Sequence, residues 1–385
     1  GGITWVTAGD SDSSTGGLAG SIGVASSAEH PTDNTAARTT LTATAWIRSG
    51  SHRRTGFDAI RLTVAITAIL VVQKVSRLGP EVQRSDSCAD RYSVPSPRRV
   101  TFDYSSLRSP VWTPSRPEFS CAANSVSLMM PIIEPYFVRS ARRTLPLLPP
   151  DLEPTARTYV QQEAEHLRQH RLFNRLLTDR YPALRRTERV MAAVYRRLED
   201  NRSLAFSCAF AAASETMAYS AARWAAERRS ELFQDADEVP ATLFLWHLAE
   251  EVEHKSAAFD IHRHIVAAEG TTVRANLRLL AAMTIALTLV VVFVVWGTTI
   301  MLAGERRLHH PIAWIRLLRW SIAFAFELLS NLAVSLLPGF HPDNFVDPMF
   351  YEVWLREFDA ETGSVPIWSD VPQVVGSTAY RASER

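Results

Sequence analysis

Two copies of the spacing Glu-x-x-His restrict the folds open to this chain more than any other feature. Glu163 and His166 form the first in "QQEAEHLRQH", and Glu251 and His254 form the second in "LWHLAEEVEHKSAAFD". Residues three apart are neighbours on one helical face, so a carboxylate and an imidazole at this spacing can hold one ion. The sequence therefore predicts two helices, more than 80 residues apart in the chain, that face each other across a metal site.

Two further glutamates stand among apolar residues, where a carboxylate is costly to bury unless a cation neutralises it. Glu215 lies in "AAASETMAY" and Glu134 lies in "MMPIIEPYF". The resulting order, Glu, Glu-x-x-His, Glu, Glu-x-x-His, is that of ferritin-like dinuclear carboxylate proteins. Because Pro135 disfavours a helical conformation at Glu134, this glutamate is expected at a helix end, with capping as its alternative role. The predicted metal ligands are Glu134, Glu163, His166, Glu215, Glu251 and His254.

A second set of polar residues lies about one helical turn from these ligands. His170 and His247 are expected to hydrogen-bond to the ligands, as metal-binding groups usually require, with direct ligation as the alternative. Glu250 competes with Glu251 for the ligand position, since it lies four residues before His254. Tyr219 follows Glu215 by one turn and is expected either to hydrogen-bond there or to pack.

The chain between 135 and 268 has helical patterning and no segment with the two-residue period of a strand. Helices are predicted over about 135–144, 155–178, 183–201, 203–233 and 241–268. The predicted fold is all-α: a ferritin-like four-helix bundle with a dinuclear metal site, followed by a hydrophobic helix or helical hairpin. The predicted divisions are a disordered or non-native extension (1–93), an extended arm (94–130), the metal-binding bundle (131–270), hydrophobic helices (271–345) and a C-terminal cap and tail (346–385).

One apolar stretch, 279–304, contains no ionisable side chain and is long enough to cross a bilayer. The alternative is a helix buried inside a large bundle or a dimer interface, which is also apolar on all sides. A second apolar stretch, 320–340, carries Glu327 and Asn331 and is expected to return across the bilayer or to lie along its surface. A membrane is therefore a candidate partner through 279–304.

Charge and cysteine content limit the remaining partners and the compartment. The net charge of +1 gives no reason to expect a nucleic acid as partner. The three cysteines are scattered and odd in number, which argues against a disulfide framework and favours a reducing compartment. The expected location is the cytoplasm or the cytoplasmic membrane, and the sequence is compatible with a homo-oligomer.

Together with "SLMMPIIEPYFVRS" and "PGFHPDN", these motifs resemble a bacterial family of predicted metal-dependent hydrolases over about 97–360. The resemblance implies a metal-binding helical protein. The positions that match the polar positions of the family are Glu163, His166, His170, Glu215, His247, Glu250, Glu251 and His254.

The predicted ligand set leaves three functions open. Carboxylate-rich sites with imidazole hold two metal ions of iron or manganese, with zinc as a further candidate, and iron is the best match. The ligand types favour an enzyme that uses O₂ to oxidise a small-molecule substrate, lipid-like if 279–304 enters a bilayer, and such an enzyme needs an electron donor. The family resemblance favours hydrolysis of an ester or amide by a metal-bound hydroxide. Metal storage or sensing is the non-catalytic alternative.

Overall fold

The computed structural model describes residues 98–107, 109–267, 272–337 and 340–358, all within the unit Thr63–Arg385. The predicted extension 1–93 and the end of the predicted tail, 359–385, lie outside these residues. The described residues form helices and no strand, as predicted. The helices are α3 (Pro117–Thr144), α4 (Glu153–Arg180), α5 (Leu184–Asn201), α6 (Leu204–Glu227), α7 (Arg229–Leu232), α8 (Glu238–Ala267), α9 (Thr272–Gly304), α10 (Pro311–Ser335) and α11 (Met349–Glu357). Short 3₁₀ turns cover Tyr104–Ser106, Leu145–Leu147 and Pro342–Asn344.

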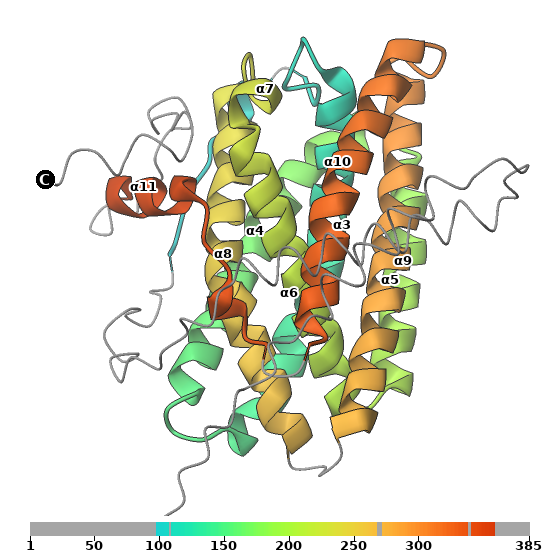
Figure 1. Cartoon of the computed structure of the whole chain (residues 1–385). Coiled ribbons are helices and arrows are strands. Elements are labelled where there is room, and N and C mark those ends of the chain that lie inside the picture. Colours follow the sequence, from blue (N-terminus) through green and yellow to red (C-terminus); the bar gives the residue numbers. More distant parts are fainter. Residues whose placement is uncertain (1–97, 108, 268–271, 338–339, 359–385) are drawn as a thin grey trace, which may run out of the picture. The chain divides into compact units, whose positions relative to one another are not determined.

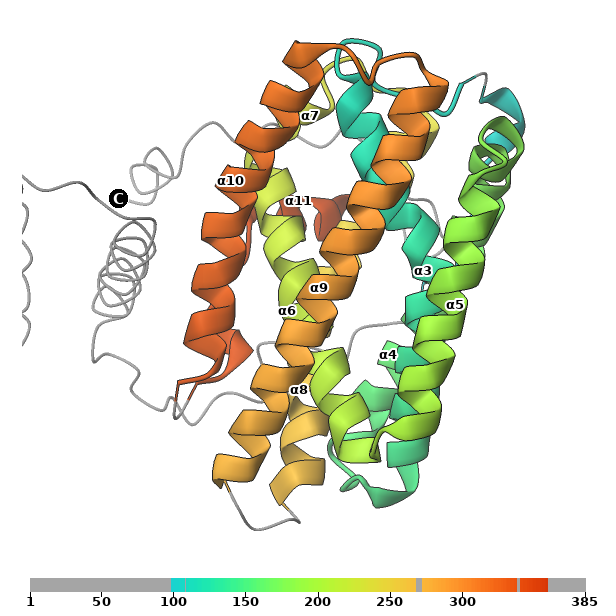
Figure 2. The same cartoon turned by 90° about the vertical axis from the view of Figure 1, so that its right-hand side faces the viewer.

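Four long helices, α3, α4, α6 and α8, run side by side and enclose the centre of the bundle (Figures 1 and 2). α3 packs mainly against α4, and α6 packs mainly against α8. Many of the buried positions of α6 are alanines, including Ala209, Ala212 and Ala213. Small side chains let neighbouring helices approach closely, because the distance between two helix axes depends on the side chains at the contact.

The first bundle helix begins well before the predicted position. α3 starts at Pro117, so the predicted extended arm 94–130 is wrong from 117 onward. Pro131 and Pro135 both lie inside α3, where proline lacks an amide donor and usually breaks a helix. The helix continues because its side chains, such as Tyr136 and Phe137, are buried in the core on both sides of the prolines. Glu134 is therefore in the middle of a helix, and the expected helix-end position is wrong.

The carbonyl group that Pro131 leaves free has a new partner. In an uninterrupted helix the amide of residue 131 would donate to the carbonyl of Ser127. That carbonyl instead accepts a hydrogen bond of 2.7 Å from the Asn174 side-chain amide of α4. The proline thus opens α3 to a side-chain contact next to the ligand-bearing face of α4.

The other predicted helices differ from the observed ones mainly at their ends. The predicted helix 203–233 divides at Arg228 into α6 and α7. The apolar stretch 279–304 is helical, but α9 begins earlier, at Thr272. α10 ends at Ser335, before the predicted end at 340.

α9 and α10 lie on the outside of the four-helix bundle (Figure 2). α9 packs against α3, α5 and α6, and α10 packs against α6. Gly297 allows one close approach, since a Cβ atom there would lie 2.8 Å from the Ser125 hydroxyl of α3. By length and composition, Val273–Gly304 and Pro311–Ser335 could each cross a membrane.

The segment 340–358 lies against α8 and includes α11. Lys255 of α8 forms an ion pair with Asp347, and its ammonium group lies over the ring of Tyr219. His341 Nε2 lies 3.0 Å from a carboxylate oxygen of Asp260, near the end of α8. These contacts connect the chain that follows α10 to the bundle.

Candidate metal centre

The six predicted ligands meet at the centre of the bundle. α3 contributes Glu134, α4 contributes Glu163 and His166, α6 contributes Glu215, and α8 contributes Glu251 and His254 (the helices are labelled in Figure 1). None of these side chains is more than 4% exposed. Helices separated along the chain thus bring four acids and two imidazoles into the protein interior.

One carboxylate oxygen lies among three imidazoles. Glu251 Oε1 is 2.7 Å from His247 Nε2, 3.8 Å from His166 Nδ1 and 3.8 Å from His254 Nδ1. His254 Nδ1 is also 3.0 Å from Glu163 Oε1. Glu251 of α8 therefore contacts the imidazole of the α4 Glu-x-x-His motif as well as two imidazoles of its own helix.

His247 belongs to the same cluster, although its expected role was to hydrogen-bond to a ligand. His247 Nε2 lies 3.8 Å from Glu134 Oε1. Glu134, His166 and His247 form one group whose ligand atoms lie within 4.8 Å of one another, and Glu163, His166, Glu251 and His254 form another. Seven side chains, including Glu215, could therefore contribute to holding metal.

Most polar atoms that face this cluster lack partners within the described residues. Six fully buried atoms have no hydrogen-bond partner there: both carboxylate oxygens of Glu134, Oε2 of Glu163, of Glu215 and of Glu251, and Nδ1 of His166. Glu163 Oε1 and His254 Nδ1 face each other at 3.0 Å. Buried polar atoms in native proteins are almost always paired. Carboxylate oxygens and imidazole nitrogens are ligands for iron, manganese and zinc. The residues present therefore fit a bound metal.

Hydrogen bonds on the far side of His166 and His254 direct one nitrogen of each ring inward. His166 Nε2 lies 2.9 Å from Glu250 Oε2, and His254 Nε2 lies 3.2 Å from Gln162 Oε1. Both acceptors are oxygens, so each Nε2 carries a proton and each Nδ1 faces the cluster, where it can bind a metal once it holds no proton. Glu250 thus contacts a ligand from outside, and Glu251 takes the central position.

His247 is directed by a longer chain of hydrogen bonds. The Ser127 hydroxyl donates to Asn174 Oδ1 at 2.7 Å, so its oxygen is free to accept from His170 Nδ1, also at 2.7 Å. His170 Nε2 then accepts from His247 Nδ1 at 2.6 Å. His247 Nε2 is left with its lone pair facing the cluster. His170 therefore supports His247, as expected.

A model of the family described as predicted metal-dependent hydrolases matches residues 96–345. The chain belongs to this family. The match spans the segment before α3 through the turn after α10, and so includes every residue of the cluster. No curated protein and no solved structure matches the chain. The family description indicates metal dependence, and the buried cluster of glutamate and histidine could hold the metal.

Burial raises the pKa values of the clustered acids in this family member. It raises the pKa values of Glu163 and Glu251 to about 7 each. The pKa values of Glu134 and Glu215 are well above the usual range, because burial and the charges of neighbouring glutamates both disfavour ionisation. Without a cation these acids retain protons, so a metal must displace protons when it binds.

The histidines respond to burial in two ways. Burial lowers the pKa of His166 well below the usual range and that of His247 to about 3, so both rings are neutral, as ligation requires. Burial also opposes protonation of His254, but its contact with Glu163 and the charges of neighbouring glutamates raise its pKa to about 10. His254 is therefore the ring from which a metal must displace a proton.

Of the two roles expected for Tyr219, the structure shows packing and not the hydrogen bond to Glu215. Its hydroxyl donates to the carbonyl of Val346, and its ring stacks on Phe345 at 5.2 Å between centroids. Tyr159 of α4 takes that place and donates a 2.7 Å hydrogen bond to Glu215 Oε1. Tyr159 precedes Glu163 by four residues, so helical spacing was a signal that could have indicated it.

Proposed function

We propose that this protein binds two iron ions in the cluster and activates O₂ to oxidise a small organic substrate. The number of buried acids carries the proposal. Four ionised carboxylates, those of Glu134, Glu163, Glu215 and Glu251, balance the charge of two divalent cations, while the histidines stay neutral. A single divalent ion would balance only two of these carboxylates, and the other two acids would stay protonated in the interior.

The closed surroundings of the cluster favour a small reactant. Its ligand side chains are almost completely buried, so a bulky ester or amide has little access. A small apolar cavity adjoins the cluster at Tyr159, with a volume of about 10 Å³ for the centre of a water-sized molecule. This is far below the ~300 Å³ at which pockets for drug-sized ligands begin. Dioxygen is small and apolar enough to occupy such a space.

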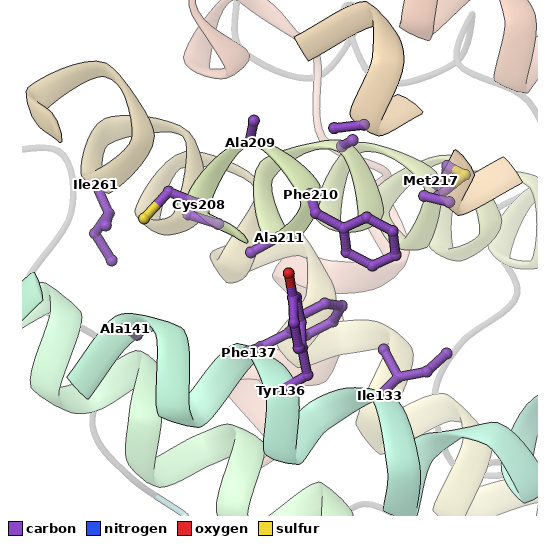
Figure 3. Packing of buried hydrophobic residues seen from close by; sticks show 14 of the residues in the cluster. Ile133, Tyr136, Phe137, Ala141, Cys208, Ala209, Phe210, Ala211, Met217 and Ile261 are labelled. Carbon is purple, nitrogen blue, oxygen red and sulfur yellow. The ribbon is translucent and has the colours of Figure 1, made fainter. Parts of the chain in front are cut away.

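The walls of this cavity come from three bundle helices besides the tyrosine. Figure 3 shows Phe137 of α3 opposite Cys208 and Ala211 of α6, with Ile261 of α8 at one side. The ring of Tyr159 lines the cavity, while its hydroxyl contacts Glu215. Tyr159 therefore lies between the cavity and the ligand cluster and contacts both.

The chain's own groups have separate tasks in this proposal. The glutamates and the inward nitrogens of the histidines hold the ions, and bound iron(II) supplies the electrons that O₂ activation requires. Tyr159 fixes Glu215 by its hydrogen bond, and the apolar side chains around the cavity exclude water. An external electron donor returns the centre to its starting state after each turnover.

Iron reconstitution tests the proposal directly. Protein purified without oxygen and titrated with Fe(II) should bind two ions per chain. Admission of O₂ should then produce oxygen consumption and a new near-ultraviolet charge-transfer band. Binding of two iron ions with neither response would overturn the oxidation proposal and leave the metal site in place. Binding of many irons per chain would indicate storage instead.

Hydrolysis is the second candidate, because the family description names it. A hydroxide activated between two metal ions can attack an ester or amide carbonyl. The same protein loaded with Zn(II) or Mn(II) and kept anaerobic separates the two functions when it is offered a panel of esters and amides. Turnover under these conditions would favour hydrolysis over O₂ chemistry.

A bilayer is the proposed partner of α9 and α10, with the cytoplasmic membrane surface as the location. The apolar stripes of α9 and α10 support this: they are rows of exposed side chains at helical spacing. They comprise Leu277, Leu280, Val291, Val292 and Val295 of α9, and Ile312, Ile315, Leu318, Ile322, Phe326 and Leu329 of α10. A second copy of the chain is the alternative partner. High-salt and carbonate washes of a membrane fraction distinguish them, since complete release into the wash argues against a lipid contact.

A further inference from the structure

Arg98 lies outside the helical bundle, in the segment that precedes α3, yet its side chain is only 5% exposed. Its guanidinium group contacts two glutamates of α8. Nη1 lies 3.0 Å from Glu250 Oε1 and 3.0 Å from Glu253 Oε2, while Nη2 lies 2.7 Å from Glu253 Oε1. One side chain therefore engages two acids that are not in the ligand cluster but lie directly beside it.

The first of these acids leads to His166. Glu250 uses Oε1 for Arg98 and Oε2 for His166 Nε2, at 2.9 Å. Arg98 fixes the carboxylate, and the carboxylate fixes the imidazole with its proton on Nε2. The unpaired Nδ1 of His166 then faces the cluster.

The second acid leads to His254 through an amide. Glu253 Oε2 accepts a 2.7 Å hydrogen bond from Gln162 Nε2. Because the nitrogen of Gln162 is committed to Glu253, its oxygen must point the other way, toward His254 Nε2 at 3.2 Å. His254 accordingly holds a proton on Nε2 and presents Nδ1 to the cluster.

We propose that Arg98 is the positioning residue of the metal centre. Through Glu250 and through Glu253 with Gln162, one guanidinium group sets the ring orientation and the tautomer of both Glu-x-x-His histidines. The inference rests on the proposed metal site, but it does not depend on whether the reaction is oxidation or hydrolysis.

Side chains near the C-terminal end of the described chain hold Arg98 in place. Trp354 and Phe358, in α11 and just after it, each have the guanidinium carbon 5.3 Å from the ring centroid. Tyr351 donates a 3.0 Å hydrogen bond to the same oxygen of Glu253 that Nη2 contacts. The segment before α3 and the C-terminal helix therefore act on the metal site together, although neither contributes a ligand.

His247 is an internal reference for this proposal. Its orientation comes from the chain Ser127, His170, His247, which includes no contact to Arg98. A change at Arg98 should therefore alter the tautomers of His166 and His254 and leave the tautomer of His247 unchanged, although the rings of His166 and His247 stack with centroids 4.0 Å apart. General loss of structure would disturb all three histidines alike.

The test compares Arg98→Met, Arg98→Lys and Arg157→Met in the full chain loaded with Zn(II), a diamagnetic probe. Arg98→Met should weaken Zn(II) binding about 10- to 100-fold, the usual effect of removing an outer partner of a metal ligand. Arg98→Lys should lie between this variant and the unchanged protein, because lysine keeps the charge but lacks the two-pronged geometry. Arg157 pairs with Glu153 on the exposed side of α4, so Arg157→Met should have no effect.

Nitrogen-15 NMR of the histidine rings in the same proteins supplies a second measurement. Arg98→Met should alter the Nε2-protonated signals of His166 and His254 and retain those of His247. Unchanged Zn(II) affinity and unchanged tautomers in Arg98→Met would overturn the proposal, whereas failure of the unchanged protein to bind Zn(II) would overturn the metal site itself.

A second variant covers the case in which Arg98→Met does not fold. Gln162→Leu preserves size and leaves the contact between Arg98 and Glu253 intact. It should remove the hydrogen bond that orients His254 and leave His166 oriented. It should therefore weaken Zn(II) binding less than Arg98→Met does. Loss of the His166 signal in Gln162→Leu, or no change at His254, would contradict the separate paths from Arg98.

Discussion

The centre of the bundle and the apolar stripes of α9 and α10 both depart from the usual distribution of side chains, but in opposite ways. In the centre, Glu134, Glu163 and Glu215 are each no more than 2% exposed. On the stripes, Val292 and Val295 are at least 50% exposed. One region places ionisable groups where apolar residues normally lie, and the other exposes apolar residues where charged ones normally lie.

Each reversal is unfavourable for the isolated chain and is relieved by a different kind of partner. Buried carboxylates are stabilised by cations, which neutralise charge that the low dielectric of the interior would otherwise penalise. Extended apolar surfaces are stabilised by a lipid phase or another protein surface. Buried ionisable groups therefore indicate an ion as the partner, and exposed apolar rows indicate a lipid phase or another protein surface.

The largest expected effect concerns the centre. Glu251→Ala removes the carboxylate oxygen that lies among His166, His247 and His254, so both metal ions should be lost while the helical content is retained. Metal analysis and circular dichroism of the purified variant measure this. Glu238→Ala, at the exposed start of the same helix, is the matched control and should keep its metal. Full metal content in Glu251→Ala would show that the centre is polar for another reason.

Proton competition should give the next largest effect. Since burial raises the pKa values of Glu163 and Glu251 to about 7, a metal displaces protons from both acids below that pH. The affinity for Zn(II) should therefore rise steeply with pH between about pH 5 and 7, by about 10-fold per pH unit for each proton that the metal displaces. Above pH 7 the rise should continue more gently, because the pKa of His254 is raised to about 10.

Calorimetry in two buffers with different heats of ionisation counts the protons released on binding. Release of about three protons or more at pH 6 is expected, from Glu163, Glu251 and His254, and fewer protons above pH 7.5, where Glu163 and Glu251 are ionised before the metal binds. An affinity that is constant between pH 5 and 7 would mean that the acids are already ionised without metal, and the polarity of the centre would then need another explanation.

Local spacing was enough to predict which glutamates and histidines meet in this centre. Glu-x-x-His places two side chains on one helical face, so Glu163 with His166 and Glu251 with His254 could be recognised without knowledge of the fold. The isolated acid Glu215 was recognisable because its sequence neighbours are apolar. The all-helical class followed in the same way from patterning within single segments.

Contacts between segments could not be predicted from spacing. Pro135 argued for a helix end at Glu134, but burial of α3 on both sides of its prolines keeps the helix intact. The choice between Tyr159 and Tyr219 as the partner of Glu215 depends on how α6 is rotated against α4, which no local pattern records. Arg98 lies outside every helix, so its approach to Glu250 depends on the path of the chain before α3.

The apolar stripes offer the third prediction, of moderate size. Val292→Lys places a charge in the middle of the α9 stripe, and a lysine at the centre of a membrane helix costs about 2.5 to 3.5 kcal/mol. The fraction of protein that stays with membranes after carbonate washing should therefore fall. Val190→Lys, at an exposed apolar position of α5, is the control and should partition like the unchanged protein. Equal partitioning of Val292→Lys would remove the bilayer as partner and leave a second copy of the chain.

The smallest expected effect lies at the junction of the two regions, where His341 connects the chain after α10 to Asp260 of α8. Burial opposes protonation of His341, but its hydrogen bonds with Asp260 and Asp343 raise its pKa from 6.5 to about 9. Its stabilising effect should thus be complete below about pH 6.5 and lost as the pH rises through 9. His341→Gln should lower the free energy of unfolding by about 0.5 kcal/mol, as for other partly exposed ion pairs, at pH 6 and by almost nothing at pH 10. Thermal unfolding of both proteins across this range measures the difference, and a gap that does not change with pH would mean that His341 acts through packing alone.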